Sequence, residues 1–361
     1  MKKPGIIFVG SFAHLSKSGH SGGMTKMCQY ILDSEISNQV NWHLIDSTAP
    51  HNKYRSFLER FFPAIKRVLL FIWFLLTRRV DKVFVFAAQG FGFYEKGLMI
   101  LIAKAFGKKT ILAPRSGFLM KDINSSERFK NRALKIFKKS DIIVCQGSNW
   151  KSFLLDKLDL DERKIVIIPN GVVLRKQVHK EINPKRVNFL FMGFVEKNKG
   201  IYDIVKSLLE LEEDKWHLNI AGEGVALEDI KDIVINSNRN TNFSFHGWVT
   251  GNVKEQLLQN ADVLLLPSYW EGMPNVILEA MARSTAVISS NVGAIQDMII
   301  QGESGFIIEA GNIEQLTTAI KTYLLNPVQI QQHKEAGVLK IEKDFTIDRI
   351  IPKFAEILIN N

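Results

Sequence analysis

Twelve short apolar runs, rich in β-branched residues, recur along the 361-residue chain, and amphipathic helix-like stretches separate most of them. Such alternation predicts parallel sheets that are covered by helices on both faces. The runs form two series of six, which favours two doubly wound Rossmann-like α/β domains over a (β/α)8 barrel, because the barrel needs eight units in one series. The predicted strands are 6–9, 40–45, 83–87, 110–113, 142–145 and 165–168, then 187–192, 217–221, 243–246, 263–266, 285–289 and 305–308.

The break between the two series is a polar, charged stretch that we expect to be an interdomain linker. The predicted organisation is a first domain at 1–172, a linker at 173–186 and a second domain at 187–343. The remainder, 344–361, contains an amphipathic helix with no strand after it.

The charge differs sharply between the two halves. Residues 1–170 hold 28 Lys and Arg against 13 Asp and Glu, whereas residues 171–361 hold 19 against 24. The net charges are therefore +15 and −5, and such halves suggest different partners. A basic first half suits phospholipid head groups, an anionic glycan or nucleic acid. Nucleic acid is the least favoured, because the sequence has neither an aromatic-basic repeat nor zinc-ligand spacing.

Two cysteines, Cys28 and Cys145, do not make a disulfide framework in a chain of this length. A reducing, cytoplasmic compartment is expected, and no signal peptide is predicted before the first strand.

One apolar run, 68–76, has basic residues on both sides. It is too short to cross a bilayer, which takes about 20 residues. Two interpretations stay open: a buried helix of the first domain, or an interfacial helix that binds a membrane surface.

Two carboxylates, Glu271 and Glu279, stand eight positions apart after the predicted strand 263–266. Glu271 falls in a loop at the carboxyl end of that strand, where open α/β sheets bind ligands. Gly272 allows backbone to approach a ligand closely, and the N–H groups that begin the next helix favour a phosphate. The pattern predicts a carboxylate near a reacting group, a phosphate site, and a second carboxylate for paired hydroxyls.

Further candidates also follow predicted strands. Gly22 and Gly23 open a helix, where backbone amides can reach a phosphate, unless they form only a flexible loop. Lys199 can meet a diphosphate as a point charge, although a lone surface lysine is usually just solvated. Trp248 is expected to stack on a base or to cover the core. Arg115 is expected to face a ligand cleft or to serve the structure.

No metal site is predicted. Asp159 and Asp161 match a DxD pattern, but they lie in a charged surface segment and are expected to be solvated. The histidines show no metal-ligand spacing.

Together these residues resemble the family-4 glycosyltransferases of the GT-B fold, which are retaining, metal-independent enzymes with nucleotide-sugar donors. The strongest match is 267–282, which contains the E-x7-E motif of that family in Glu271 and Glu279. Weaker matches are 168–171, Lys199 with Gly200, 247–249, 293–297 and 302–306. The resemblance covers nearly the whole chain and implies two Rossmann-like domains facing a cleft, with the final helix crossing back to the first domain.

The resemblance also implies residue roles. Glu271 would contact the donor sugar beside the reacting carbon, and Glu279 would bind the donor ribose. Lys199 and the amides that follow Pro274 would hold the diphosphate, and the paired glycines would close on it from the other domain. The expected catalytic residues are Glu271 and Arg115, and the expected donor-binding residues are Gly22, Gly23, Lys199, Trp248, Gly272, Met273, Asn275, Val276, Ile277 and Glu279.

Two positions depart from the family pattern. Phe194 stands where the family often has an arginine, so one diphosphate cation is missing, and Lys197 is an open substitute. Arg115 stands where many members have a histidine that orients donor or acceptor.

The expected reaction moves a sugar from a nucleotide-sugar, favoured as a UDP-sugar, to a glycan acceptor with retained configuration and without cofactor or metal. The basic first half suits a lipid-linked acceptor, as in O-antigen, capsule or lipopolysaccharide assembly, and peripheral contact with the anionic cytoplasmic face of a membrane. Two alternatives stay open: a catalytically inactive membrane scaffold, and an enzyme, a phosphorylase or disaccharide synthase, that acts on soluble sugars.

Overall fold

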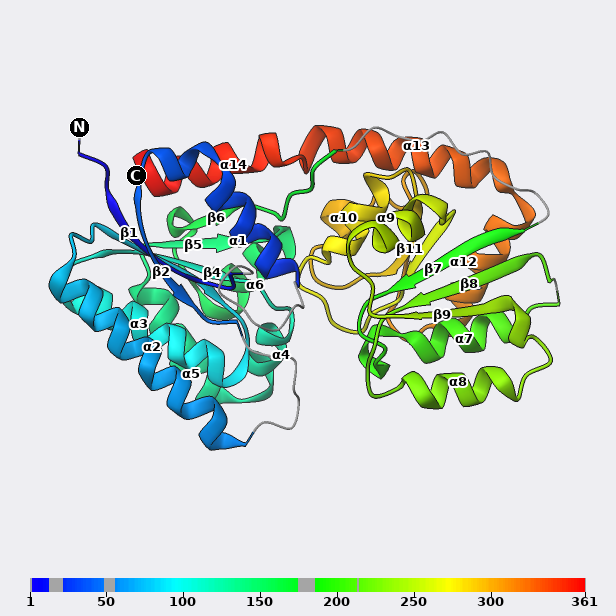
Figure 1. The fold of residues 1–361 in the computed structure, drawn as a ribbon, viewed down its shortest axis with the longest axis horizontal. Helices are drawn as coiled ribbons and strands as arrows, with labels where there is room; N and C mark the ends of the chain where they lie inside the picture. Colours follow the sequence, from blue (N-terminus) through cyan, green and yellow to red (C-terminus); the bar gives the residue numbers. More distant parts are fainter. Residues whose placement is uncertain (1, 13–21, 49–55, 175–185, 213, 361) are drawn as a thin grey trace. The chain divides into compact units, whose positions relative to one another are not determined.

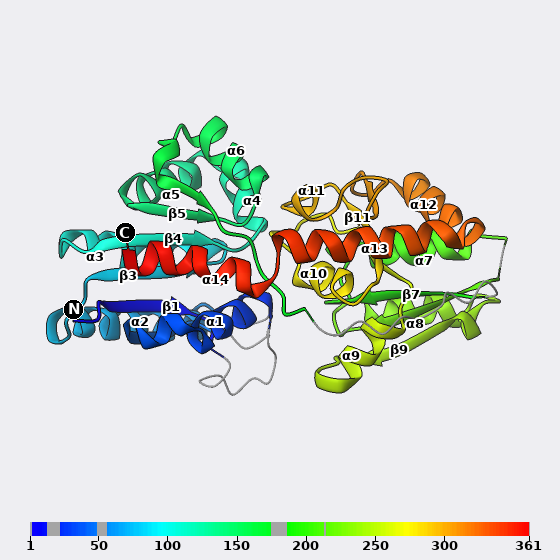
Figure 2. The ribbon, with the colours of Figure 1, turned by 90° about the horizontal axis from the view of Figure 1, so that it is seen from above.

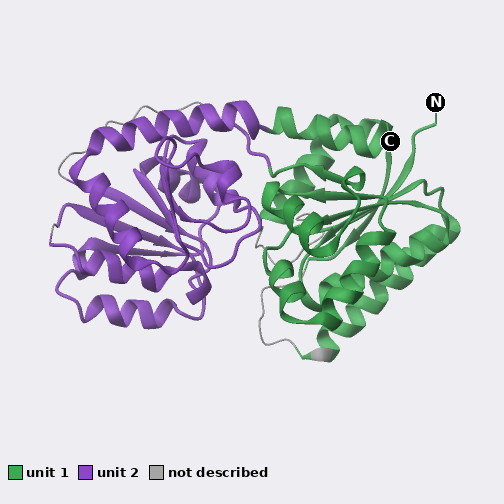
Figure 3. Ribbon diagram, turned by 180° about the vertical axis from the view of Figure 1, so that it is seen from behind, with its two compact units in different colours: residues 1–170, 347–361 green, residues 171–346 purple. Residues whose placement is uncertain are grey.

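The chain divides into two compact units in the computed structural model, which describes residues 2–12, 22–48, 56–174, 186–212 and 214–360. Unit 1 comprises residues 1–170 and 347–361, and unit 2 comprises residues 171–346 (Figure 3). Most of the predicted linker, 175–185, lies outside the described residues.

Unit 1 is built on a six-stranded parallel sheet with the order β2-β1-β3-β4-β5-β6. Its strands are β1 (Gly5–Gly10), β2 (Asn41–Asp46), β3 (Lys82–Ala87), β4 (Lys109–Pro114), β5 (Ile142–Cys145) and β6 (Ile165–Ile167). Its α-helices are α1 (Gly23–Asp33), α2 (Phe57–Thr77), α3 (Gly90–Ala105), α4 (Phe118–Ser125), α5 (Glu127–Lys139), α6 (Ser148–Leu158) and α14 (Ile347–Ala355).

Unit 2 has a second six-stranded parallel sheet with the order β12-β11-β10-β7-β8-β9. Its strands are β7 (Val187–Met192), β8 (Trp216–Ala221), β9 (Phe243–Gly247), β10 (Val263–Leu266), β11 (Ala286–Ser290) and β12 (Phe306–Ile308). Its α-helices are α7 (Ile201–Leu209), α8 (Leu227–Ile235), α9 (Gly251–Asn260), α10 (Asn275–Met281), α11 (Ile295–Met298), α12 (Ile313–Leu325) and α13 (Pro327–Asp344).

The predicted fold class is confirmed, because both sheets are parallel and doubly wound. Successive side chains of a strand point to opposite faces, and in β1 both sets are buried. Ile7 and Val9 pack into one apolar cluster, while Ile6 and Phe8 pack into another. A strand that is buried on both faces has no polar alternation, which explains the continuous apolar runs in the sequence.

The last helix of the chain packs on unit 1. Helix α14 runs across one face of the sheet of this unit (Figures 1 and 2). Ile350 and Phe354 are fully buried there, and the ring centroid of Phe354 lies 5.9 Å from that of Phe84. Apolar burial therefore attaches the end of the chain to the unit in which the chain begins.

Helix α2 contains the apolar run whose role the sequence left open. Ala64, Phe71 and Leu75 are buried against unit 1. The opposite face is exposed, with Leu69 60% and Leu76 68% exposed. The inner face of α2 is therefore buried, as the first interpretation expects, whereas its outer face is apolar and exposed and stays open for the second. Among the described residues, no helix is long and apolar enough to span a membrane.

Candidate functional site

The loops at the carboxyl edge of the sheet in unit 2 pack directly on one another. Gly200, which follows the loop after β7, has a positive φ of 74°, and a Cβ there would lie 2.3 Å from the carbonyl oxygen of Pro267. The Tyr269 N–H donates to the Asn198 carbonyl over 2.9 Å. Only glycine permits this approach, which brings the loop after β7 against the loop after β10.

The two packed loops carry Lys199 and Glu271. Lys199 Nζ lies 2.6 Å from Glu271 Oε1, and the hydroxyl of Ser268 donates to the same oxygen over 2.9 Å. The side chains of Lys199 and Glu271 are 19% and 10% exposed. The structure thus joins two predicted site residues that are 72 positions apart, and it adds Ser268, which the sequence analysis missed.

A third loop supports the backbone of Glu271. Gly293, after β11, has a φ of 59°, and a Cβ there would lie 2.4 Å from the carbonyl oxygens of both Glu271 and Gly272. The Ala294 N–H donates to the Gly272 carbonyl over 2.8 Å. Glu271 is therefore fixed through its side chain and its main chain, as a reacting or binding group requires.

Glu279 lies on α10 and is almost fully buried, with 5% of its side chain exposed. Its Oε2 lies 2.6 Å from Lys254 Nζ of α9. Arg283 donates to the Glu279 carbonyl over 2.8 Å and forms an ion pair with Glu255 of α9. Lys254 is a second residue that the sequence analysis missed, because the packing of α9 on α10 cannot be read from linear spacing.

The other predicted donor residues of this motif lie in the loop after Glu271 and in the first turn of α10. Met273 is buried, whereas Asn275 and Val276 are half-buried. The N–H of Ile277 donates to the Pro274 carbonyl over 3.1 Å. The backbone N–H of Ile277 is therefore already used within this turn.

Aromatic side chains lie at the ends of β7 and β9. The rings of Phe194 and Trp248 have centroids 5.0 Å apart and are inclined by 32°. Gly224, after β8, packs so closely that a Cβ would lie 2.3 Å from the Val195 carbonyl oxygen. Phe194, which replaces the arginine of the family pattern, thus forms an aromatic pair with a predicted base-binding residue.

Arg115, in unit 1, follows β4 and is held by three neighbours. Its guanidinium carbon lies 4.3 Å from the ring centroid of Phe86 and 5.6 Å from that of Phe354 on α14. Its Nη1 donates to Asn170 Oδ1 over 3.2 Å. Burial lowers the pKa of Arg115 to about 10. These contacts link β4 to Asn170 and α14, so they describe a structural arginine, and its catalytic role stays a prediction.

Gly22 and Gly23 are the N-cap and the first residue of α1, so the predicted helix start is present. A Cβ at Gly22 would meet no atom of the described residues within 4 Å. The loop before them, 13–21, lies outside the described residues. Their contact with a donor phosphate stays a prediction.

The two aspartates of the DxD pattern, Asp159 and Asp161, lie at helix ends. Asp159 caps α6 in a left-handed conformation, with φ 46°. The carboxylate of Asp161 accepts from the backbone N–H of Arg163 over 3.0 Å and forms an ion pair with its guanidinium. In the part of the chain that the structure describes, no three His, Cys, Asp or Glu side chains gather as metal ligands.

Comparison with known proteins defines the class. Sucrose-phosphate synthase from Thermosynechococcus elongatus is similar in structure with a TM-score of 0.80, over 98% of both chains, at 17% sequence identity. The two-unit parallel architecture is therefore the GT-B glycosyltransferase fold.

The family follows from the sequence of unit 2. Residues 174–338 match the family described as glycosyl transferases group 1. This region, which carries Lys199, Glu271 and Glu279, belongs to that family.

Curated relatives are distant. A glycogen synthase of Mycobacterium tuberculosis is 23% identical over 246 residues, which are 67% of this chain and 58% of the relative. An Escherichia coli UDP-Gal:alpha-D-GlcNAc-diphosphoundecaprenol alpha-1,3-galactosyltransferase is 27% identical over 241 residues, 60% of each chain. The chain thus spans about three fifths of these relatives.

Proposed function

We propose that this protein is a retaining glycosyltransferase that moves a sugar from a UDP-sugar to a hydroxyl of a glycan acceptor. The Lys199–Glu271 pair carries the proposal, because it lies at the carboxyl edge of a doubly wound sheet, where such folds bind ligands. The family match of this region and the named donor of the Escherichia coli relative support the choice of a nucleotide-sugar.

We infer the role of each residue from the charges that develop during sugar transfer. The leaving diphosphate gains negative charge, which Lys199 would stabilise as a preorganised cation. Glu271 would accept hydrogen bonds from donor sugar hydroxyls beside the anomeric carbon and favour its developing positive charge. Glu279, which is paired with Lys254, would bind the ribose hydroxyls.

The proposed stereochemical path is a front-face displacement. A double displacement needs a carboxylate on the face opposite the leaving group, and the motif supplies only Glu271 near the anomeric carbon. In the front-face path the leaving phosphate takes the proton of the acceptor hydroxyl. No metal is required in this path, since Lys199 and backbone amides carry the charge.

The proposed acceptor is a lipid-linked glycan in the assembly of a surface polysaccharide. Helix α2 supports contact with an anionic membrane, because its outer face is apolar and the exposed side chains of Arg60, Lys66, Arg78 and Arg79 accompany it. Cations of this kind are attracted to anionic lipid. The relative from Escherichia coli acts on a diphosphoundecaprenol-linked sugar, as its name states.

The donor is tested by thermal shift with UDP, GDP, ADP and CMP, each with and without magnesium. Stabilisation by UDP that magnesium does not change is expected. The transfer test then uses a UDP-sugar panel with a lipid-linked acceptor, and Glu303→Gln, at an exposed carboxylate, serves as the control variant. Stabilisation by UDP without transfer to any acceptor would favour an inactive scaffold, in which Phe194 and Trp248 bind without reacting.

Membrane contact is tested by sedimentation with phosphatidylglycerol vesicles. Leu69→Glu places a charge on the exposed apolar face of α2, and burying one leucine contributes about 1.5–3 kcal/mol. Binding should therefore fall about tenfold or more. Equal binding of the variant and the original chain would contradict the proposed contact and favour an enzyme that acts on soluble sugars.

A further inference from the structure

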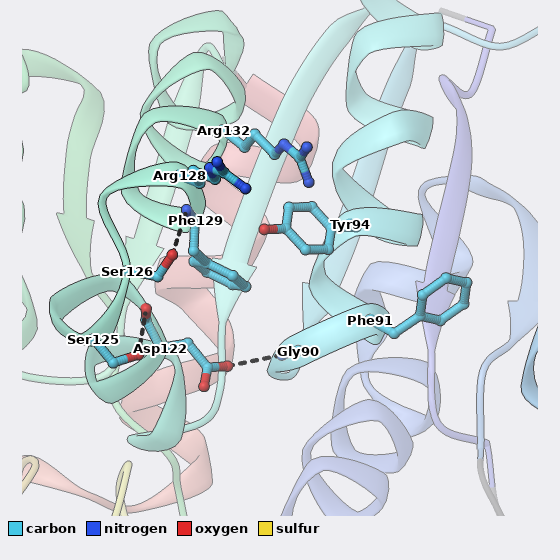
Figure 4. Close-up of a pocket in the computed structure, with 9 residues that line it drawn as sticks. All are labelled: Gly90, Phe91, Tyr94, Asp122, Ser125, Ser126, Arg128, Phe129 and Arg132. Carbon is cyan, nitrogen blue, oxygen red and sulfur yellow. Dashed lines mark hydrogen bonds between the residues drawn. The ribbon is translucent and has the colours of Figure 1, made fainter. Parts of the chain in front are cut away.

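A pocket of about 410 Å³ lies in unit 1, where the start of α3 meets the end of α4 and the first turns of α5 (Figure 4). None of the residues predicted for the donor or for catalysis lines it. The lining residues that bear on its chemistry are Gly90, Tyr94, Asp122, Arg128, Phe129 and Arg132.

Two cations line one end of the pocket. Arg128 and Arg132 are four positions apart on α5, so they project from the same face of the helix. The guanidinium carbon of Arg132 lies 5.7 Å from the ring centroid of Tyr94. Both arginines are exposed, and within the described ranges neither forms an ion pair with a carboxylate. Two guanidinium groups placed together favour an anion that accepts several hydrogen bonds, such as a phosphate.

Helix α5 as a whole strengthens the attraction. It carries six Lys and Arg against one acidic residue, Glu127. That carboxylate lies 3.3 Å from Lys130 and not against the two arginines. The local field at the pocket is therefore positive, which raises the local concentration of an anionic ligand.

Aromatic rings and a carboxylate complete the lining. The ring centroids of Tyr94 and Phe129 lie 4.9 Å apart, and these rings lie between the arginines and Asp122 (Figure 4). Asp122 accepts the Gly90 N–H over 2.9 Å, and a carboxylate can accept about four hydrogen bonds in total. An apolar surface next to such an acceptor suits the faces and the hydroxyls of a sugar ring.

We propose that this pocket binds a glycosyl phosphate, with its phosphate on Arg128 and Arg132 and its sugar against Tyr94 and Phe129. The volume of 410 Å³ lies within the range of small-ligand sites, about 300–1,000 Å³. The inference rests on the proposed function and deepens it, because it names a phosphate-bearing sugar as the ligand of unit 1.

The test measures binding of glucose 1-phosphate, methyl α-glucoside and inorganic phosphate to the full chain by calorimetry. The double variant R128Q/R132Q removes both cations of the pocket. The matched control K138Q/K139Q removes two positive charges from the same helix outside the lining. Glucose 1-phosphate should bind the original chain and the control equally, and it should bind R128Q/R132Q at least about tenfold more weakly. Both other probes should bind the original chain more weakly than glucose 1-phosphate.

Three results would overturn the proposal: no binding of glucose 1-phosphate to the original chain, equal binding to all three proteins, or inorganic phosphate binding as tightly as the sugar phosphate. A thermal shift with UDP is recorded on the same samples. A UDP shift that persists while the pocket test fails leaves the proposed function standing. Binding of glucose 1-phosphate without any UDP shift supports the pocket and contradicts the proposed donor.

The source of the phosphate is resolved by adding phosphatidylglycerol vesicles. Unchanged affinity for glucose 1-phosphate in their presence supports a sugar ligand. Displacement by the vesicles, together with vesicle binding that R128Q/R132Q abolishes, would assign the arginines to a lipid head group and overturn the proposal.

Discussion

Strand β10 has a carboxylate paired with a lysine near each of its ends, and the two pairs differ in their surroundings. At the amino end, Asp262 and Lys334 lie 3.1 Å apart with side chains 0% and 3% exposed. Beyond the carboxyl end, Glu271 and Lys199 lie 2.6 Å apart with side chains 10% and 19% exposed. The first pair is sealed inside unit 2, while the second can reach a ligand.

The two carboxylates also differ in the elements that their partners connect. Asp262 also accepts the Asn188 N–H over 2.9 Å, so it joins β10 to β7, while Lys334 joins β10 to α13. Glu271 is bound by Lys199, which ends a short 3-10 helix after β7, and by Ser268 in the loop after β10. The geometry of an ion pair alone does not distinguish a binding site from a structural contact, and the place of the Lys199–Glu271 pair at the carboxyl edge of the sheet is what supports its proposed role.

The largest effect on stability is expected from Asp262→Ala. The substitution leaves the buried amine of Lys334 without this carboxylate, and breaking such a pair costs about 3–5 kcal/mol. Urea unfolding measures the loss, with Glu303→Ala as an exposed control expected within about 0.5 kcal/mol. Should the alanine variant not fold, Asp262→Asn keeps an acceptor for Asn188. A loss of unfolding free energy below about 1 kcal/mol in either variant would contradict the structural role of the Asp262–Lys334 pair.

Glu271→Ala should give the opposite pattern. We expect transfer to fall about 10²–10³-fold, the loss typical of a group that stabilises developing charge, or about 2.7–4 kcal/mol of activation free energy. Stability should change by less than about 1 kcal/mol, because Lys199 can turn toward water. Steady-state kinetics and urea unfolding on the same variant check both parts. Unchanged turnover would contradict the role of the E-x7-E motif.

Glu279 is intermediate, since it is nearly as buried as Asp262 but lies in the predicted donor site. Glu279→Ala should weaken UDP binding by about 1.5–3 kcal/mol, through loss of charge-assisted hydrogen bonds to hydroxyls. Calorimetry measures this change, and Glu314→Ala, on the first turn of α12, is the control. If UDP affinity is unchanged while stability falls, the Glu279–Lys254 pair has a structural role like that of the Asp262–Lys334 pair.

The sequence predicted the strands and the E-x7-E carboxylates, but not the partners of those carboxylates. The strands were predicted from short runs rich in apolar and β-branched residues, a pattern that is strongest where a strand such as β1 or β10 is buried on both faces. The edge strands β2 and β9 are partly exposed and contain polar residues. Ser268 and Lys254 were not predicted as site residues, because no sequence spacing links a single polar residue to a carboxylate elsewhere in the chain. Only the packing of the fold brings them next to Glu271 and Glu279. For Arg115 the sequence left a ligand-facing and a structural role open, and only the folded structure shows its guanidinium near the rings of Phe86 and Phe354.

The smallest effect tests whether α13 is a structural element, as the Asp262–Lys334 pair implies. His333, next to Lys334, lies 2.7 Å through Nδ1 from the Tyr323 hydroxyl and 3.1 Å through Nε2 from the Gly302 carbonyl. Burial lowers the pKa of His333, although the bond to Gly302 opposes this shift. The unfolded chain therefore takes up the proton first. The stabilising contribution is present above about pH 6.5 and is lost as the pH falls toward the lowered value, by at most about 1.4 kcal/mol per pH unit.

Urea unfolding of the original chain and of His333→Gln between pH 7.5 and 5.5 measures this contribution. The difference in stability between the two proteins should shrink as the pH falls, whereas His246→Gln, at an exposed position, should show a smaller change. UDP affinity should change equally with pH in both proteins, because His333 acts on the docking of α13 and not on the Lys199–Glu271 pair. A pH-dependent difference in UDP affinity would show that the sealed side of unit 2 is coupled to the site, and the separation drawn between the two ends of β10 would fail.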